Sequence, residues 1–149
     1  MLGLLLSIST GLAGNLKNDY SWEKSPTVQI CPDANINEDK VKQAISFWDA
    51  QGVNVNIKDI KKVAKCGAKS KNVIQIMGDR DVRPHEHAAT TIDWYYYGVQ
   101  NSKTTYYIVR AKVQIPHNVN DTIIFHEIGH ALGLGHSNHE VMYAYQYNH

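Results

Sequence analysis

The sequence predicts a single α+β domain with a mixed β-sheet, one helix packed behind the sheet and a second helix near the end. Short segments alternate between apolar and polar residues, and a segment with helical spacing separates the first two of them. A strand, a helix and a strand in succession favour parallel pairing of the two strands. The length of 149 residues suits one domain with a core and is too short for two ordinary ones.

The first strand and the backing helix are expected within the first 52 residues. Residues 27–30 alternate in the manner of a strand, and the turn-forming residues from Pro32 to Ala34 end it. Asn37 can cap the following helix, which runs to Gly52. Its apolar positions recur at helical spacing and should face the sheet; they are Val41, Ala44, Ile45 and Trp48.

Further strands are expected downstream. Residues 53–58 alternate and predict a second strand, and residues 73–77 predict a buried third one. The lysine-rich segment 58–71 is interpreted as a solvated connection, because it has no interleaved aromatic residues that could stack on bases. Residues 104–115 predict one long strand or a hairpin arm, which Pro116 ends.

The most informative stretch is residues 126–136, HEIGHALGLGH, in a helix that Asn120 or Asp121 can cap. The histidines at 126 and 130 project from one face of that helix, so both imidazoles can reach one zinc ion. Glycine at 133 or 135 can end the helix in the left-handed conformation and return the third histidine to the same ion. The apolar stripe of the helix is Ile123, Ile124, Ile128, Ala131 and Leu132.

Three histidine ligands leave the fourth position of a tetrahedral zinc site open, which is typical of catalytic rather than structural sites. The sequence therefore predicts one catalytic Zn²⁺ held by His126, His130 and His136. Glu127, beside the first ligand, is the predicted catalytic base and would activate a zinc-bound water for attack on a carbonyl. The alternative is a chance pair of surface histidines, which the third histidine disfavours.

This stretch resembles the elongated zinc-binding motif of the metzincin metalloproteases, and Ser137 directly after it is most similar to the matrixin branch. The resemblance extends over about residues 27–143. It implies a metzincin-like twisted mixed β-sheet with one antiparallel edge strand, a long backing helix, an active-site helix and a short C-terminal part. It also implies that Met142 lies under the zinc as a hydrophobic floor. Substrate would pair with the edge strand, for which the candidates are Ala88, Ala89 and Thr90.

The chain departs from the family pattern at several points. Only six residues follow Tyr143, so the usual C-terminal helix is expected to be missing or minimal. The five residues between His136 and Met142 suggest a shallow specificity pocket. No structural zinc or calcium is predicted. Four other histidines lack the pattern of a second zinc site and are interpreted as exposed loop residues; they are His85, His87, His117 and His139.

The N-terminal segment and the cysteines bear on the compartment. Residues 1–14 resemble a short signal peptide, with an apolar run but no preceding Lys or Arg, and residues 15–149 would form the single catalytic domain. The apolar run is too short to span a bilayer, so no stable membrane insertion is expected. Cys31 and Cys66 either form one disulfide or remain two buried thiols. These features favour a secreted or extracytoplasmic protein.

The predicted function is that of a zinc-dependent endopeptidase that hydrolyses peptide bonds in extended protein or peptide substrates. The formal net charge of +1 gives no overall electrostatic case for nucleic acid as a partner, and a monomer is expected. Two alternatives remain open: a non-catalytic, zinc-stabilised module for peptide binding or adhesion, and a zinc hydrolase of another amide or ester. A gluzincin-type site is disfavoured, because Glu140 is too near to His130 to be its third ligand.

Overall fold

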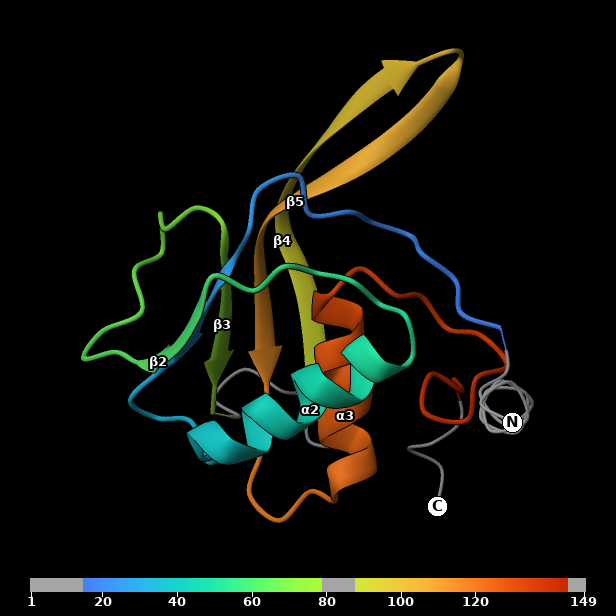
Figure 1. Ribbon diagram of the computed structural model, residues 1–149. Helices are drawn as coiled ribbons and strands as arrows, with labels where there is room; N and C mark the ends of the chain where they lie inside the picture. Colours follow the sequence, from blue (N-terminus) through green and yellow to red (C-terminus); the bar gives the residue numbers. More distant parts are fainter. Residues whose placement is uncertain (1–14, 79–87, 145–149) are drawn as a thin grey trace, which may run out of the picture.

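A computed structural model describes residues 15–78 and 88–144 and confirms the expected α+β fold (Figure 1). Five strands form one mixed sheet in the order β2-β1-β3-β5-β4. Their pairing is parallel except between β4 and β5, so β4 is the expected antiparallel edge strand. The strands are β1 (Thr27–Ile30), β2 (Asp59–Lys62), β3 (Val73–Met77), β4 (Ala89–Gln100) and β5 (Lys103–Gln114).

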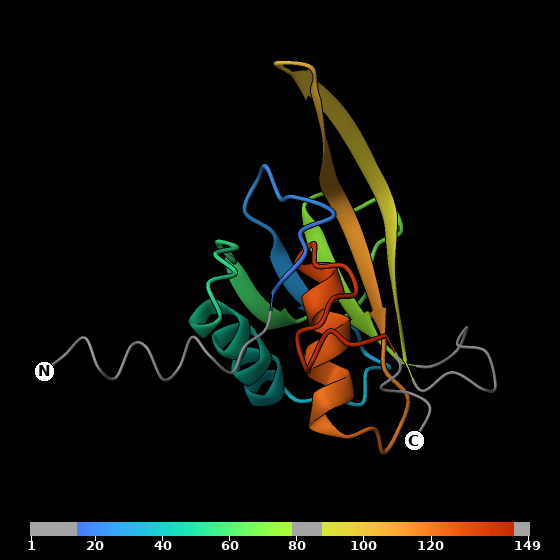
Figure 2. The ribbon, with the colours of Figure 1, turned by 90° about the vertical axis from the view of Figure 1, so that its right-hand side faces the viewer.

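Two helices, α2 (Glu38–Ala50) and α3 (Asp121–Ala131), lie on the same side of the sheet (Figures 1 and 2). Each begins at an asparagine whose side chain accepts a bond from the first turn: Asn37 from the Lys40 N–H, and Asn120 from the Ile123 N–H. The Trp48 side chain of α2 is fully buried between helices and sheet, and its indole N–H donates to the Phe125 carbonyl of α3. None of the described helices is long and apolar enough to cross a membrane.

The second strand is not where the alternation placed it. Residues 53–58 form no strand: the Val53 N–H bonds back to the Trp48 carbonyl and the Lys58 N–H bonds to the Pro26 carbonyl. Their apolar side chains are half-buried against the core. The alternating pattern therefore reflects which side chains are buried, although the backbone does not pair with a neighbouring strand. Strand β2 instead begins at Asp59, inside the segment that was interpreted as a solvated connection.

The longest pairing in the sheet is the β4–β5 hairpin, which projects beyond the other strands (Figures 1 and 2). The expected long strand 104–115 is β5, and the aromatic run 94–97 belongs to β4. The turn places Asn101 and Ser102 at positive φ, 52° and 62°, as a two-residue type I′ hairpin turn requires. The register shifts on both sides of Trp94, which separates the base of the hairpin from its outer part.

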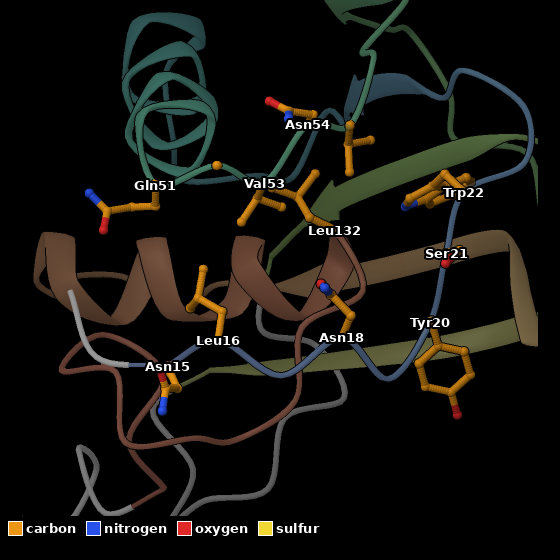
Figure 3. A pocket seen from close by; sticks show the side chains of 12 residues that line it. Asn15, Leu16, Asn18, Tyr20, Ser21, Trp22, Gln51, Val53, Asn54 and Leu132 are labelled. Atoms are coloured by element: carbon orange, nitrogen blue, oxygen red, sulfur yellow. The ribbon is translucent and has the colours of Figure 1, made fainter. Parts of the chain in front are cut away.

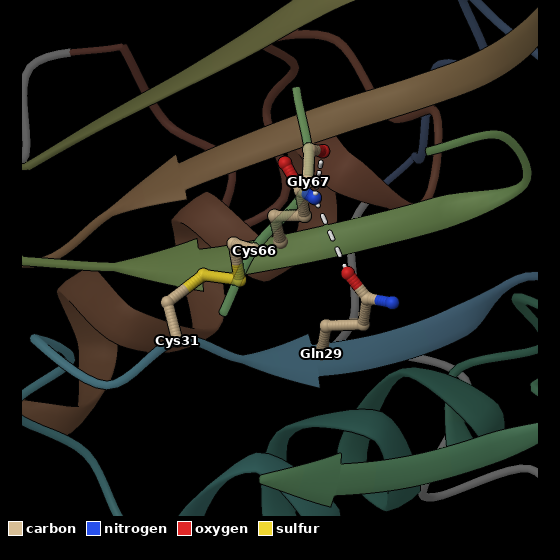
Figure 4. The surroundings of a disulfide bond; sticks show 5 residues. Gln29, Cys31, Cys66 and Gly67 are labelled. Atoms are coloured by element: carbon tan, nitrogen blue, oxygen red, sulfur yellow. Dashed lines mark hydrogen bonds between the residues drawn. A yellow bond between two sulfur atoms is a disulfide. The ribbon is translucent and has the colours of Figure 1, made fainter. Parts of the chain in front are cut away.

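Cys31 and Cys66 are joined by a disulfide with a Cα–Cα distance of 5.6 Å (Figure 4). The bond ties the end of β1 to the connection that follows β2. Beside it, the buried Gln75 side chain donates to the Gly67 carbonyl (2.8 Å) and to the Gln29 side chain (3.2 Å). This cross-link fixes a segment that has little regular structure of its own.

Removing the disulfide should lower stability. Its cysteines are 35 residues apart, and the entropy of closing such a loop corresponds to about 4 kcal/mol. We expect a Cys31→Ala/Cys66→Ala protein to lose about 2–4 kcal/mol in free energy of unfolding, measured by urea denaturation. An unchanged denaturation midpoint would contradict this assignment.

Candidate metal centre

Three histidine side chains converge at the C-terminal half of α3. The Nε2 atom of His130 lies 3.0 Å from Nε2 of His126 and 3.2 Å from Nε2 of His136. Among the described residues, these three histidines each offer one ring nitrogen to a metal, and the three nitrogens lie within 4.8 Å of one another. The structure therefore brings together the three ligands that the sequence predicted.

The Nδ1 atoms of the two helical histidines bond to backbone carbonyls. Nδ1 of His126 lies 2.6 Å from the Val141 carbonyl, and Nδ1 of His130 lies 2.7 Å from the Leu134 carbonyl. Because a carbonyl only accepts, each Nδ1 carries a proton and donates it, so in the neutral tautomer of each ring the lone pair is on Nε2. Backbone carbonyls commonly orient metal-binding histidines in this way.

The convergence of these lone pairs fits a zinc ion. Nε2 atoms 3.0–3.2 Å apart without a proton between them repel one another unless a cation lies among them. Two ligands at about 2.05 Å from a tetrahedral zinc would be about 3.3 Å apart, close to the separations found here. Burial, with a smaller contribution from the neighbouring histidines, lowers the pKa of His126 to about 4 and favours its neutral form.

Gly133 ends α3 and redirects the chain. It has a φ of 109°, in the left-handed region, and the N–H of Leu134 bonds back to the Gly129 carbonyl. A Cβ at Gly133 would also overlap the Tyr20 carbonyl. The helix therefore ends where the sequence indicated, and His136 returns to the two helical histidines.

Residues 15–20 form a segment, the N-terminal strap, that holds the loop of His136. The N–H groups of Asp19 and Tyr20 donate to the Gly133 carbonyl (2.9 and 3.0 Å), and the Gly135 N–H donates to the Lys17 carbonyl (2.8 Å). The Asp19 carboxylate occupies the space that a Cβ on Gly135 would need. Sequence reasoning missed this contact, because the strap is polar and has no periodic pattern.

A cavity of about 530 Å³ lies behind the strap (Figure 3). It is bounded by the strap, by residues 51–55 after α2 and by Leu132 at the end of α3. None of the three converging histidines lines it. The cavity is therefore separate from the metal centre.

Met142 lies against the helix that carries the ligands. Its side chain is fully buried, and its sulfur is 2.6 Å from the position that a Cβ on Gly129 would take. The Trp48 ring approaches the same position to 2.9 Å. Glycine at position 129 is therefore required by the packing of Met142 and Trp48, and Met142 is part of the buried core. Its place as the floor under the zinc stays a prediction.

His139 is not the exposed loop residue that was expected. It is 1% exposed, packs beside the Trp48 ring, accepts a bond from the Val141 N–H at Nδ1, and has Nε2 3.2 Å from the Gln51 side-chain oxygen. A satisfied bond at each nitrogen allows this polar ring to be buried. His117 is exposed, as expected, whereas His85 and His87 lie outside the described residues.

Glu127 is 3% exposed, and a side chain of the edge strand β4 holds it in place. The Thr90 Oγ1 lies 2.5 Å from the Glu127 carboxylate oxygen Oε2 and 2.8 Å from the Glu127 backbone carbonyl. Thr90 is one of the residues expected at the substrate rim, and its hydroxyl contacts the glutamate. Ala88 is buried just before β4 and Ala89 begins it; in the described chain, β4 pairs only with β5, so its other edge is open.

A family model described as dual-action HEIGH metallo-peptidase matches residues 22–144, most of the chain. The five letters of that description are the sequence of residues 126–130, which carry two of the converging histidines and the buried glutamate. A search of curated proteins found no match.

Removing one of the converging histidines should abolish tight zinc binding. We expect His130→Ala to weaken zinc affinity by more than about 100-fold, measured by competition with a chromophoric chelator, because two ligands remain and one backbone anchor is lost. The exposed His117 provides the matched control, and His117→Ala should bind zinc as the unmodified protein does. Equal zinc affinity in both variants would contradict the three-histidine site.

Proposed function

The chain belongs to the HEIGH metallopeptidase family and is a zinc metallopeptidase of the metzincin type, and we propose that it is an endopeptidase acting on extended protein or peptide substrates. The observation that carries the proposal is the buried Glu127 carboxylate, on the same helix as two of the converging histidines. It lies beside the edge of β4 that pairs with no other strand of the described residues. An extended peptide can pair with such an edge and so bring its backbone near the glutamate.

The protein groups have distinct roles in this proposal. Bound by His126, His130 and His136, zinc would polarise the scissile carbonyl and make water more acidic. Glu127 takes a proton from the attacking water as the carbon–oxygen bond forms, and returns it to the leaving amine as the carbon–nitrogen bond breaks. The Thr90 hydroxyl, donating to Oε2, keeps the carboxylate in one orientation.

Finer assignments belong to the same proposal. Ser137 after the third histidine supports placement near the matrixin branch. The disulfide supports an oxidising compartment, and with it the assignment of residues 1–14 as a signal peptide and of residues 15–149 as the catalytic domain. The presence of Glu127 beside the histidines argues against the alternative of a non-catalytic binding module.

Replacing Glu127 by glutamine should abolish proteolysis while keeping the metal. The amide has nearly the same shape but cannot accept a proton, so we expect casein cleavage to fall by between about 10² and 10⁴-fold. Zinc content, measured by atomic absorption, should stay at the level of the unmodified protein. Proteolysis that persists in a Glu127→Gln preparation free of other proteases would contradict the mechanism.

The Thr90 hydroxyl should matter for turnover more than for substrate binding. Thr90→Val keeps the shape of the side chain and removes the donor to Glu127, so we expect kcat to fall about tenfold with little change in KM or zinc content. Thr91→Val, at the adjacent exposed position of β4, is the matched control and should retain normal kcat. If both variants have normal kcat, Thr90 does not position the glutamate.

A further inference from the structure

The outer part of the β4–β5 hairpin carries an aromatic surface that the proposed chemistry does not use. Four tyrosines form it, and we call it the tyrosine face: Tyr20, Tyr95, Tyr97 and Tyr106. Tyr20 lies 5.4 Å from Tyr95 and 5.9 Å from Tyr106 between ring centroids, and Tyr106 lies 5.8 Å from Tyr95 and 6.4 Å from Tyr97. The rings form one continuous cluster across both strands.

Three of the four rings, those of Tyr95, Tyr97 and Tyr106, are exposed to solvent, and Tyr20 is half-buried beneath them. Tyr97 is 67% exposed and Val99, on the same side of β4, is 65% exposed. In the ladder, Tyr95, Tyr97 and Val99 stand opposite Ile108, Tyr106 and Thr104, so none of these six positions carries a charge. Contiguous exposed aromatic residues are typical of binding surfaces.

The two edges of the sheet differ in a way that points to the kind of partner. At one edge, β2 has four residues and carries exposed Lys61 and Lys62, which discourage the pairing of another strand. At the other edge, β4 has twelve residues without a lysine or arginine. Among residues 15–78 and 88–144, the sheet therefore protects one edge and leaves a long edge open to an added strand.

The open edge connects the tyrosine face to the site of the proposed reaction. Thr90, near the start of β4, contacts Glu127, and Tyr97 lies seven positions further along the same strand, about 20 Å away. The register shifts around Trp94 interrupt the edge between these two parts. A long substrate would thus contact two separate segments of one strand.

We propose that the tyrosine face and the adjacent edge of β4 form a secondary binding site for polypeptide substrates. A neutral, extended stretch of the substrate, remote from the bond that is cut, pairs with residues 95–100 and packs against the tyrosine rings. This inference rests on the proposed endopeptidase function. It makes the enzyme selective for long unfolded chains over short peptides.

Other partners fit the surface less well. A nucleic acid or an anionic membrane requires basic residues, and the face has none. Residues 100–103 at the tip are polar, unlike an element that inserts into lipid. The rings meet at angles between 58° and 72°, so they do not form the flat platform on which sugar rings stack.

The test compares two pairs of cross-strand tyrosines. Tyr97 and Tyr106 are partners on the tyrosine face, whereas Tyr96 and Tyr107 are partners on the opposite face of the same strands. We expect Tyr97→Ser/Tyr106→Ser to lower kcat/KM for casein about tenfold, mainly through KM, and to leave cleavage of an octapeptide within about twofold. Tyr96→Ser/Tyr107→Ser changes side chains on the opposite face and keeps the backbone groups of β4 with which the substrate would pair, so it should alter neither. Both proteins should keep normal zinc content.

A binding measurement separates this proposal from the function on which it rests. Both double variants are also made in the Glu127→Gln protein, and binding of fluorescein-labelled casein is followed by anisotropy. Casein binding that is weakened by the Tyr97/Tyr106 change and not by the Tyr96/Tyr107 change supports the site even if no substrate is cleaved. Equal binding by all three proteins overturns the proposal. Binding that depends on Tyr97 and Tyr106 to chitin or phosphatidylcholine vesicles, with none to casein, overturns the assignment of a polypeptide partner.

Discussion

Two hydrogen bonds, from Nδ1 of His126 and of His130 to backbone carbonyls, fix the geometry on which the rest of the site depends. They place a proton on Nδ1 of each ring and direct Nε2 of each ring toward the point where the three histidines converge. The accepting carbonyls, at Val141 and Leu134, both belong to the chain that follows α3. The helical ligands are therefore oriented only once the chain has turned at Gly133 and returned.

The sequence predicts best those features that depend on neighbours along the chain. One helix begins at the predicted Asn37 cap, and the other begins at Asn120, one of its two predicted caps. The histidine spacing fixes the ligand set because positions 126 and 130 share a helical face whatever surrounds them. The third histidine follows from a glycine that can adopt positive φ. These are local constraints, and a single sequence contains all the information they need.

The features that were missed depend on partners far away in the chain. The alternation in residues 53–58 correctly reports which side chains are buried, but whether such a segment becomes a strand depends on an available edge, which β2 occupies instead. His139 carries no local sign of burial; its ring is accommodated by Gln51, 88 residues earlier, and by the neighbouring Trp48 ring. The hydroxyl of Thr90 meets Glu127 only because β4 runs beside α3.

The position of the third ligand, His136, depends on the N-terminal strap. His136 reaches the other two histidines on a loop whose backbone is bonded at Gly133 and Gly135 to a segment more than a hundred residues away in sequence. A single backbone cut between Lys17 and Asp19 would leave every ligand and the catalytic glutamate intact, yet it would divide the segment that holds this loop. Proteolytic cleavage between Lys17 and Asp19 would therefore determine how long the metal centre stays intact. Any peptidase that removes the leading residues would have to stop short of the strap to leave a stable enzyme.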